Sequence, residues 1–361
     1  MDPITIALVS DIYPTRTLDG LPESALQAFE VLRQADLAIG NFEIPLSDRG
    51  APIEKLLNIR AAPEIASGLG QLGLDVVTLA NNHSVDYGWP ALEQTRQLLE
   101  AQGLRVVGAG PTLSDAMRGA ICEIKGRRIG VIAFSCLLPG GMAATPARPG
   151  ISPIRIRTSY EIDPVYQIEE PGEPAVVTVR TRVHDDDLAR ACRAVADLRQ
   201  ACDHVIVSIH WGFGSGEDPA EYQMPLAHAL VEAGADVIHG HHPHAVQGIA
   251  FHQGKPILFS GNVFIGQQVF LDASDQVKAM WDEMSPLGYV ARIHLKGPGE
   301  IGVGIIPVVL DQDRLPGLAR GNELEDCRRR LTRLSERFGC RVDAAKDCLI
   351  VRPGEGSGLS T

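Results

Sequence analysis

The sequence contains no long apolar run and no CxxC cysteine pair, and its basic run Arg328-Arg329-Arg330 lies in a helical pattern, where we expect a solvated helix face. A membrane-spanning helix needs about 18 to 20 consecutive apolar residues, and no such run occurs. The N-terminal stretch Met1–Val9 also lacks the basic region and the extended apolar core of a secretory signal. We therefore expect a cytoplasmic protein with no membrane partner.

The charge and the cysteines exclude further classes of protein. The formal net charge of −12 argues against nucleic acid or an anionic membrane surface as the main partner, because both attract clustered basic residues. Seven cysteines are an odd number without zinc-ribbon spacing, so we expect reduced, mostly buried thiols and no disulfide framework. The sequence shows no internal repeat or heptad array, and it predicts no particular oligomeric state.

Apolar, strand-like segments alternate with helical patterns along most of the 361 residues. This alternation predicts an α/β fold in which helices cover both faces of a mainly parallel sheet. An adjacent hairpin at 121–123 and 128–134 would make the sheet mixed. The other expected strands are 4–9, 37–40, 75–80, 104–107, 204–210, 237–239, 245–251, 257–259, 289–295 and 301–309, and the expected helices are 22–34, 63–72, 90–102, 185–201, 219–233 and 323–338.

Residues 1–352 are predicted to form one domain with an irregular insertion at 137–183. The insertion is rich in proline and glycine, and a loop of this length usually serves as a lid or substrate wall, with a floppy linker as the alternative. Residues 264–288 are expected to help shape the substrate pocket. The tail 353–361 is rich in glycine and serine and is predicted to be disordered.

Polar side chains of the metal-binding type directly follow several expected strands. Asp11 follows the first strand, and the segments Asn41–Glu43, Asn81–His83 and His210–Gly212 follow later ones. Open α/β sheets place their sites at the carboxyl ends of strands, so these residues are expected to meet. The segment Gly240–His244 is the strongest signal, because three imidazoles within four positions after a buried strand have little structural use.

The ligand types predict a divalent metal cofactor. Imidazole and carboxylate groups suit Mn²⁺, Zn²⁺ or Fe²⁺, while carboxylate and amide oxygens also accept Ca²⁺ or Mg²⁺. Several metals therefore fit the pattern, bound as one or two ions.

Taken in order, these motifs resemble the CapA family, which is named for capsule and poly-γ-glutamate synthesis proteins. The resemblance covers about residues 4–265. It implies the calcineurin-like metallophosphoesterase fold, an α/β fold with central mixed sheets layered with helices and a metal site at the carboxyl ends of strands. It also implies five metal ligands, namely Glu43, Asn82, His210, His242 and His244.

The sequence departs from the metallophosphoesterase pattern in two motifs. Tyr13 stands where the usual first motif, Asp-x-His, has its histidine ligand, and Glu43 replaces the bridging aspartate. With one ligand missing, a site for a single ion is as consistent with the sequence as a site for two. Capsule proteins with a membrane-anchoring N-terminus also differ from this chain, so the resemblance is to the soluble branch of the family.

That branch includes the peptide epimerases of lasso-peptide biosynthesis, which invert a Cα centre with His/Asp pairs beside a metal. Epimerisation needs one group to remove the Cα proton, another to return a proton, and positive charge near the intermediate. We expect His83, oriented by Asp86, to form one pair and Asp11 with His294 to form the other. Asp86 could instead cap the next helix, and His294 could simply face solvent.

Two other functions fit the same residues. A phosphoesterase would use a metal-activated water, with His83 protonating the leaving group. A metal-stabilised binding or assembly protein for polyglutamate-like chains is the third hypothesis. For either enzyme, the expected partner is a peptide or small-molecule substrate.

Overall fold

The computed structural model describes residues 2–214, 216–297, 299–346 and 348–354, and two central sheets organise this part of the chain. The larger sheet has ten strands, which are β1 (Ile4–Tyr13), β2 (Leu37–Phe42), β3 (Val76–Thr78), β4 (Arg105–Val107), β15 (Val263–Gly266), β16 (Leu287–Gly297), β17 (Glu300–Leu310), β18 (Pro316–Leu318), β19 (Cys340–Ala344) and β20 (Leu349–Pro353). β1 to β4 run parallel, and β15 pairs in parallel with β1. Beyond β1, the strands β16, β17, β20 and β19 pair antiparallel, so the sheet is mixed.

Six strands form the second sheet, namely β6 (Ala120–Ile124), β7 (Arg127–Ser135), β11 (His204–His210), β12 (Val237–His241), β13 (Ile249–His252) and β14 (Lys255–Leu258). The inner strands β7, β11, β12 and β14 run parallel, and β6 and β13 pair antiparallel at the two edges. The hairpin expected near 121–134 exists as β6 and β7. The prediction that it joins the sheet of the preceding strands is wrong. It begins the second sheet and does not extend the first.

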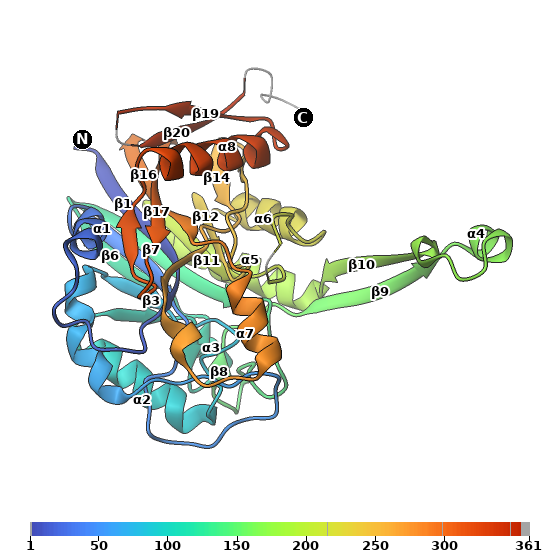
Figure 1. The fold of residues 1–361 in the computed structure, drawn as a ribbon, viewed down its shortest axis with the longest axis horizontal. Coiled ribbons are helices and arrows are strands. Elements are labelled where there is room, and N and C mark those ends of the chain that lie inside the picture. The colour runs from blue at the N-terminus through green and yellow to red at the C-terminus, as the bar shows by residue number, and fades with distance from the viewer. Residues whose placement is uncertain (1, 215, 298, 347, 355–361) are drawn as a thin grey trace.

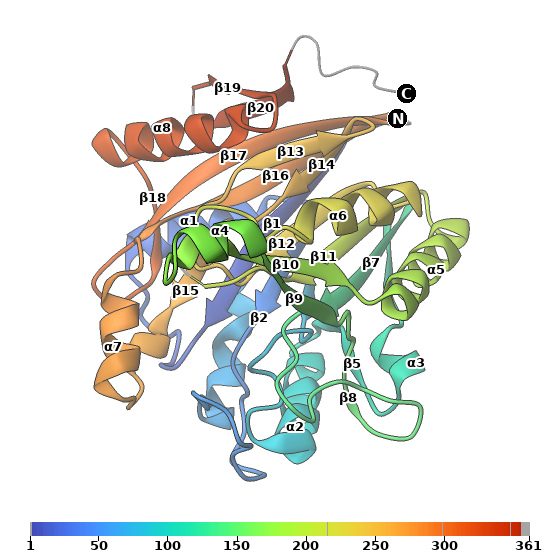
Figure 2. The same cartoon turned by 90° about the vertical axis from the view of Figure 1, so that its right-hand side faces the viewer.

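The two sheets pack face to face, and helices cover their outer faces (Figure 2). The covering helices are α1 (Glu23–Arg33), α2 (Gly88–Ala101) and the 3-10 helix η1 (Pro63–Leu72) on the larger sheet, with α5 (Asp185–Ala201) and α6 (Gln223–Glu232) on the smaller. Ile6 and Leu8 of β1 share the buried layer between the sheets with Val131 and Ile206. Their strands are apolar on both faces because a sheet or a helix covers each face.

The second half of the predicted insertion forms a regular arm, where the sequence predicted irregular structure. Short β5 (Ala109–Gly110) and β8 (Gly150–Ile151) pair within the body. The arm, residues 156–183, consists of β9 (Ile156–Ile162), α4 (Pro164–Glu169), the 3-10 helix η2 (Pro174–Val176) and β10 (Val177–Val183). β9 and β10 form a two-stranded antiparallel ribbon, and Figure 1 shows the arm projecting from the body.

The remaining elements are α3 (Leu113–Ala116), η3 (Gln267–Phe270), α7 (Asp275–Asp282) and α8 (Asn322–Glu336). Residues 264–288 are therefore more regular than the sequence suggests, since they contain η3 and α7. At the C-terminus, Pro353 still belongs to β20, whereas the sequence places it in the disordered tail. Gly354 follows β20, and residues 355–361 of that predicted tail lie outside the described residues.

All seven cysteines are unpaired, and Cys122, Cys202, Cys327 and Cys340 are buried, which confirms the expectation of free thiols. None of the helices in the described part of the chain combines the length and the apolar character that crossing a bilayer requires.

Candidate metal centre

Strand ends from both sheets meet at one buried cluster of polar side chains. In the larger sheet, Asp11 lies in β1, Glu43 follows β2, and Asn82 follows β3. In the second sheet, β11 ends in His210 and β12 leads into His242. Asp11, Glu43 and His210 are completely buried. The structure therefore brings together the strand-end residues that the sequence singled out.

One half of the cluster gathers around His210. Its Nε2 atom lies 2.6 Å from Oδ1 of Asn82 and 3.2 Å from Oε1 of Glu43. The ring centre of His242 lies 4.7 Å from that of His210. Among the described residues, neither Oε1 of Glu43 nor Nδ1 of His242 has a hydrogen-bond partner. Buried ligand atoms without partners, close to other ligand types, fit a bound cation.

The other half of the cluster surrounds Asp11. Its Oδ2 atom accepts a hydrogen bond from the backbone N–H of His242 at 3.2 Å and lies 3.6 Å from Nε2 of His244. That same Nε2 atom lies 3.0 Å from the hydroxyl of Tyr13. The hydroxyl of Tyr13 is therefore within hydrogen-bonding distance of the same His244 nitrogen that faces Asp11.

The loop after β12 holds its histidines in an unusual backbone conformation. His242 has a φ of 101° and His244 a φ of 49°, in the left-handed region that side chains other than glycine rarely adopt. Before them, Gly240 leaves no room for a side chain, because a Cβ atom there would lie 2.3 Å from the carbonyl oxygen of Phe259. Strained residues of this kind concentrate at functional sites.

His83 and Asp86 form a hydrogen-bonded pair beside the cluster. Nδ1 of His83 lies 2.7 Å from Oδ2 of Asp86, as the sequence predicted. Lys55 donates to Oδ1 of Asp86 at 2.5 Å and to the backbone carbonyl of Asn82 at 2.6 Å. Asp86 does not cap α2, because its second oxygen accepts from His83 and from the backbone N–H of Ile59.

Two asparagines and one more histidine orient the cluster. Asn41 donates from Nδ2 to Asp11 at 2.7 Å and to Glu43 at 3.0 Å, and it accepts from Asn81 at 3.0 Å. Nδ1 of His241 lies 2.8 Å from Nδ1 of His210. Hydrogen bonds of this kind fix the direction of metal ligands. The sequence motifs contained these three residues without indicating their roles, and Lys55 carried no signal at all.

Burial sets the electrostatics of the cluster. It raises the pKa of Asp11 well above its usual value, and the neighbouring Glu43 adds to the rise. It raises the pKa of Glu43 to about 8. Burial also lowers the pKa of His242 well below its usual value and that of His244 to about 4, so these imidazoles are neutral. Neutral imidazoles can ligate a metal, and a cation would stabilise the carboxylate of Glu43.

His294 lies far from this cluster, which corrects its predicted pairing with Asp11. β16 does run beside β1, but the antiparallel register places His294 opposite Thr5, whose hydroxyl lies 3.4 Å from its Nδ1. Thr5 precedes Asp11 by six residues on the same strand, or about 20 Å at the rise of an extended chain.

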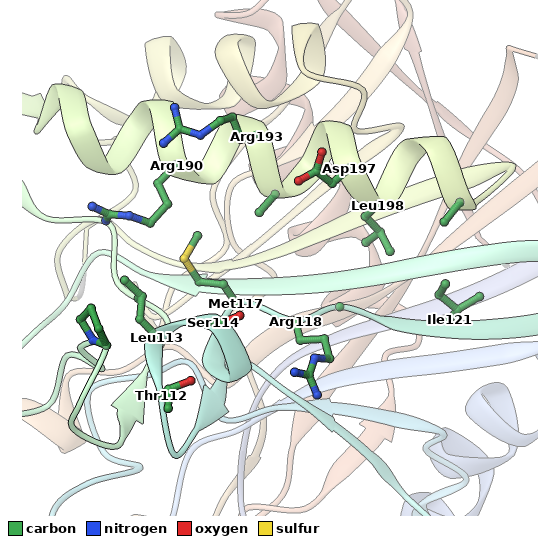
Figure 3. Close-up of a pocket in the computed structure, with 14 residues that line it drawn as sticks. Thr112, Leu113, Ser114, Met117, Arg118, Ile121, Arg190, Arg193, Asp197 and Leu198 are labelled. Atoms are coloured by element: carbon green, nitrogen blue, oxygen red, sulfur yellow. The ribbon is translucent and has the colours of Figure 1, made fainter.

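A large surface cavity lies away from the cluster. It has a volume of about 870 Å³ and is lined by residues in and next to α3 and by residues of α5, among them Thr112, Met117, Arg190 and Leu198 (Figure 3). None of the candidate ligands or acid–base residues lines it. The chemistry of the strand ends therefore belongs to a separate, buried site.

Two groups of side chains in the described chain could hold a metal ion. They are Asp11 with His210 and His241, and Glu43 with His242 and His244, and in each group the ligand atoms lie within 4.8 Å of one another. Asn82 adds an amide oxygen next to His210. The donor set of imidazole, carboxylate and amide groups fits a divalent ion.

Comparison with known proteins places the chain in a family. Residues 8–268 match the family described as bacterial capsule synthesis protein PGA_cap. The chain is 28% identical over 276 residues to the PGA biosynthesis protein CapA of Bacillus subtilis, covering 74% of this chain and 64% of that protein. It is also 28% identical over 312 residues to an uncharacterized protein of Sinorhizobium fredii, covering 73% of this chain and 66% of that protein.

A third relative is a probable polyglutamine synthesis accessory protein of Mycobacterium tuberculosis. It is 29% identical over 320 residues, which cover 87% of this chain and 76% of that protein. The matched part of the B. subtilis protein amounts to less than two thirds of its length. The family match spans most of the present chain, including every candidate metal ligand. The chain therefore belongs to the PGA_cap family of bacterial capsule synthesis proteins.

Proposed function

We propose that the protein is a metal-dependent epimerase that exchanges a Cα proton in a peptide. The main support is the presence of two His/Asp pairs in contact with the same tyrosine. His83 lies 2.7 Å from Asp86, and His244 lies 3.6 Å from Asp11. Tyr13 makes edge contacts with both imidazoles, at ring-centre distances of 6.3 Å to His83 and 5.8 Å to His244.

The metal would be held by Glu43, Asn82, His210 and His242. Their ligand atoms lie close together, and two of them lack a hydrogen-bond partner among the described residues. When bound, a divalent ion supplies the positive charge that polarises a substrate carbonyl and acidifies the neighbouring Cα proton. The second-sphere contacts of Asn41 and His241 would keep these ligands in place.

Tyr13 supports a site for one ion. It replaces a histidine ligand of ordinary metallophosphoesterases, and its hydroxyl engages Nε2 of His244 at 3.0 Å. A second ion would have to displace this contact. Without a second ion, Asp11 and His244 remain free to transfer protons.

The two pairs supply the two proton-transfer steps that inversion requires. Asp86 can hold Nδ1 of His83 and stabilise the imidazolium that forms when Nε2 takes the Cα proton. Lys55 balances the charge of Asp86 with an ion pair of 2.5 Å. The pair of Asp11 and His244 then returns a proton from the other face of the substrate. It takes the part that the sequence assigned to Asp11 and His294.

Peptides are the proposed substrate class. Two relatives are named for PGA biosynthesis and for polyglutamine synthesis, so glutamyl chains are the first substrates to test. A ribosomal precursor peptide, such as that of a lasso peptide, is the other form that we propose.

A phosphoesterase is the second candidate, and one observation favours it. Glu43, His242 and His244 could together hold an ion, which would lie close to the ligands around His210. Two neighbouring ions could activate water for phosphoester hydrolysis, with His83 protonating the leaving group. A role in binding or assembling polyglutamate chains, without catalysis, is a third candidate that the names of the relatives suggest.

Deuterium exchange tests the epimerase directly. The metal-loaded protein is incubated in D₂O with α-linked and γ-linked L-oligoglutamates and with linear precursor-type peptides, followed by mass and chiral analysis. We expect deuterium at an inverted Cα, lost in His83→Ala and Asp11→Asn and retained in His294→Ala. Exchange absent from every peptide, together with rapid release of nitrophenol from a bis(nitrophenyl) phosphate, would support the phosphoesterase. Stable binding of oligoglutamate without either reaction would support the binding protein.

A further inference from the structure

The arm is a two-stranded ribbon with one apolar and one polar face. In β9 the side chains at even positions share a face with those at odd positions of β10, because these residues pair across the ribbon. The apolar face carries Ile156, Thr158, Tyr160, Ile162, Val177, Val179, Thr181 and Val183, and the polar face carries Arg157, Ser159, Glu161, Thr178, Arg180 and Arg182. Only the base of the apolar face is covered, because Ile156 and Val183 pack against the core of the smaller sheet. A two-stranded ribbon whose remaining apolar face is exposed is marginal in water.

Exposed apolar side chains are concentrated on the arm. Eleven large hydrophobic side chains are exposed in the described part of the chain, and seven of them belong to the arm. Tyr160 is 69% exposed, Val179 is 55% exposed, and Ile168 of α4 is 79% exposed. An exposed apolar surface of this extent marks an interaction site.

The two edges of the ribbon differ. The edge of β10 is partly covered, because the backbone N–H of Thr181 donates to Glu221 at 2.6 Å and the side chain of Arg180 lies 3.3 Å from the same carboxylate. No strand in the described ranges pairs with the outer edge of β9. An uncovered edge presents backbone donors and acceptors that can pair with another strand.

The backbone alternation shows which groups of β9 point outward. The N–H of Thr181 bonds Glu221, so Thr181 and its partner Thr158 form a pair that does not exchange backbone hydrogen bonds. Such pairs alternate with hydrogen-bonded pairs along an antiparallel ladder. The backbone groups of Thr158, and by alternation those of Tyr160 and Ile162, therefore face away from β10.

We propose that two copies of the chain associate through these edges, with β9 pairing antiparallel to β9 of the second copy about a two-fold axis at Ser159. This register joins the outward backbone groups of Thr158 to those of Tyr160 in the second copy. It also places Ile156 opposite Ile162 of the second copy. The result is a four-stranded sheet with one continuous apolar face, built from identical surfaces as in most homodimers.

The charges of β9 are self-complementary in this register. Arg157 lies opposite Glu161 of the second copy, so the dimer gains two symmetry-related cross-strand pairs of opposite charge. Cross-strand pairs of this kind stabilise a sheet, whereas like charges directly opposite each other destabilise it. Moving the axis to Thr158 or Tyr160 separates Arg157 from Glu161 of the second copy. The same symmetry applied to β10 would place Arg180 opposite itself.

The distribution of charge along the whole arm points the same way. Arginines gather near the base of the arm, and acidic side chains gather toward its tip, where they are Glu161, Asp163, Glu169, Glu170 and Glu173. Antiparallel arms bring the acidic tip of one copy beside the basic base of the other. This complementarity selects a second copy of the chain as the occupant of the edge.

Charge reversal tests the pairing by sedimentation and light scattering over a range of concentrations. We expect wild type to have twice the mass of one chain, and Arg157→Glu or Glu161→Arg to be monomeric, because each places like charges together. The double variant should recover the dimer. Arg157 makes no ion pair in the described chain and faces Arg182 across the ribbon, so its reversal breaks no ion pair of its own arm. Glu161, by contrast, also contacts Arg180 at 2.9 Å.

Cysteine cross-linking tests the register. In Ser159→Cys, the two introduced thiols would face each other across the axis and form a disulfide between copies under mild oxidation. Thr178→Cys, on the same face of the ribbon but on β10, is the matched control and should cross-link no more than wild type. A monomeric wild type at every concentration, a dimer that survives replacement of residues 157–182 by a short glycine–serine linker, or equal cross-linking of the two variants would overturn the proposal.

Discussion

The metal centre and the arm depart from ordinary burial in opposite directions. In the centre, Asp11 and Glu43 are fully buried, whereas on the arm Tyr160 and Ile168 are 69% and 79% exposed. A buried carboxylate is costly unless a positive charge or hydrogen bonds stabilise it, and an exposed apolar ribbon gains stability when another surface covers it. Each region thus suits a different partner, a cation in one case and a protein surface in the other.

The largest expected effect is on the chemistry of the centre. His83→Ala should reduce Cα deuterium exchange by about 10² to 10⁴-fold, because it removes a proton-transfer group. Asp86→Asn should reduce exchange as well, since the imidazolium would lose its carboxylate partner at 2.7 Å. The measurement is the initial rate of deuterium uptake by mass spectrometry. Wild-type rates in both variants would remove the His83 and Asp86 pair from the mechanism.

A weaker effect is expected when the orientation of the ligands is disturbed. Asn41→Ala removes the donor that holds Asp11 at 2.7 Å and Glu43 at 3.0 Å. The loss of such a contact should weaken metal affinity by about 10 to 100-fold. Competition titration with a fluorescent chelator measures the change, and unchanged affinity would show that Asn41 has no part in holding the ligands.

These side chains also show what the sequence could predict. The strand-end residues could be predicted because each directly follows an apolar segment. The carboxyl ends of parallel strands lie at the same edge of a sheet, so these residues were expected to meet. The separation of Asp11 from His294 could not be predicted, because it depends on the register between β1 and β16, which places His294 opposite Thr5. Lys55 was missed because it comes from a loop with no motif of its own.

The arm was hidden by its composition. Prolines and glycines at 164, 171, 172 and 174 suggested an irregular loop. They are confined to the turn region, where α4 and η2 connect the strands. The alternation of apolar and polar residues along 156–162 does indicate a strand. The many prolines and glycines nearby favoured an irregular loop instead.

The junction of arm and body offers a test by stability. Asp187 accepts from the guanidinium of Arg155 at 2.7 and 2.8 Å and from Arg190 at 2.7 Å. Burial opposes its ionisation, but these hydrogen bonds outweigh burial and lower the pKa of Asp187 to about 2. Asp187→Asn should lower the free energy of unfolding by about 2 kcal/mol at neutral pH. Urea unfolding measures this difference.

The pH dependence of that difference has a definite sign. The folded pKa of Asp187 is depressed, so its stabilisation is complete above the unfolded value near 3.8 and is lost as the pH falls through about 2. The gap in stability between wild type and Asp187→Asn should therefore narrow over that acidic range. A gap that stays constant with pH would contradict the ion-pair account.

The smallest expected effect is at His294, which the sequence paired with Asp11 and which the structure places away from it. His294→Ala should change deuterium exchange by less than about twofold, because a substitution away from the reacting groups leaves their geometry intact. A loss comparable to that of His83→Ala would restore His294 to the mechanism.

The number of metal ions bound per chain tests most directly whether His242 is a metal ligand while His244 is not. Each protein is loaded, dialysed and measured by inductively coupled plasma mass spectrometry. We predict one divalent ion per chain in wild type and in His244→Ala, and none in His242→Ala. Two ions in wild type with one lost in His244→Ala would show that His244 is a ligand, and would contradict its proposed role with Asp11 in proton transfer.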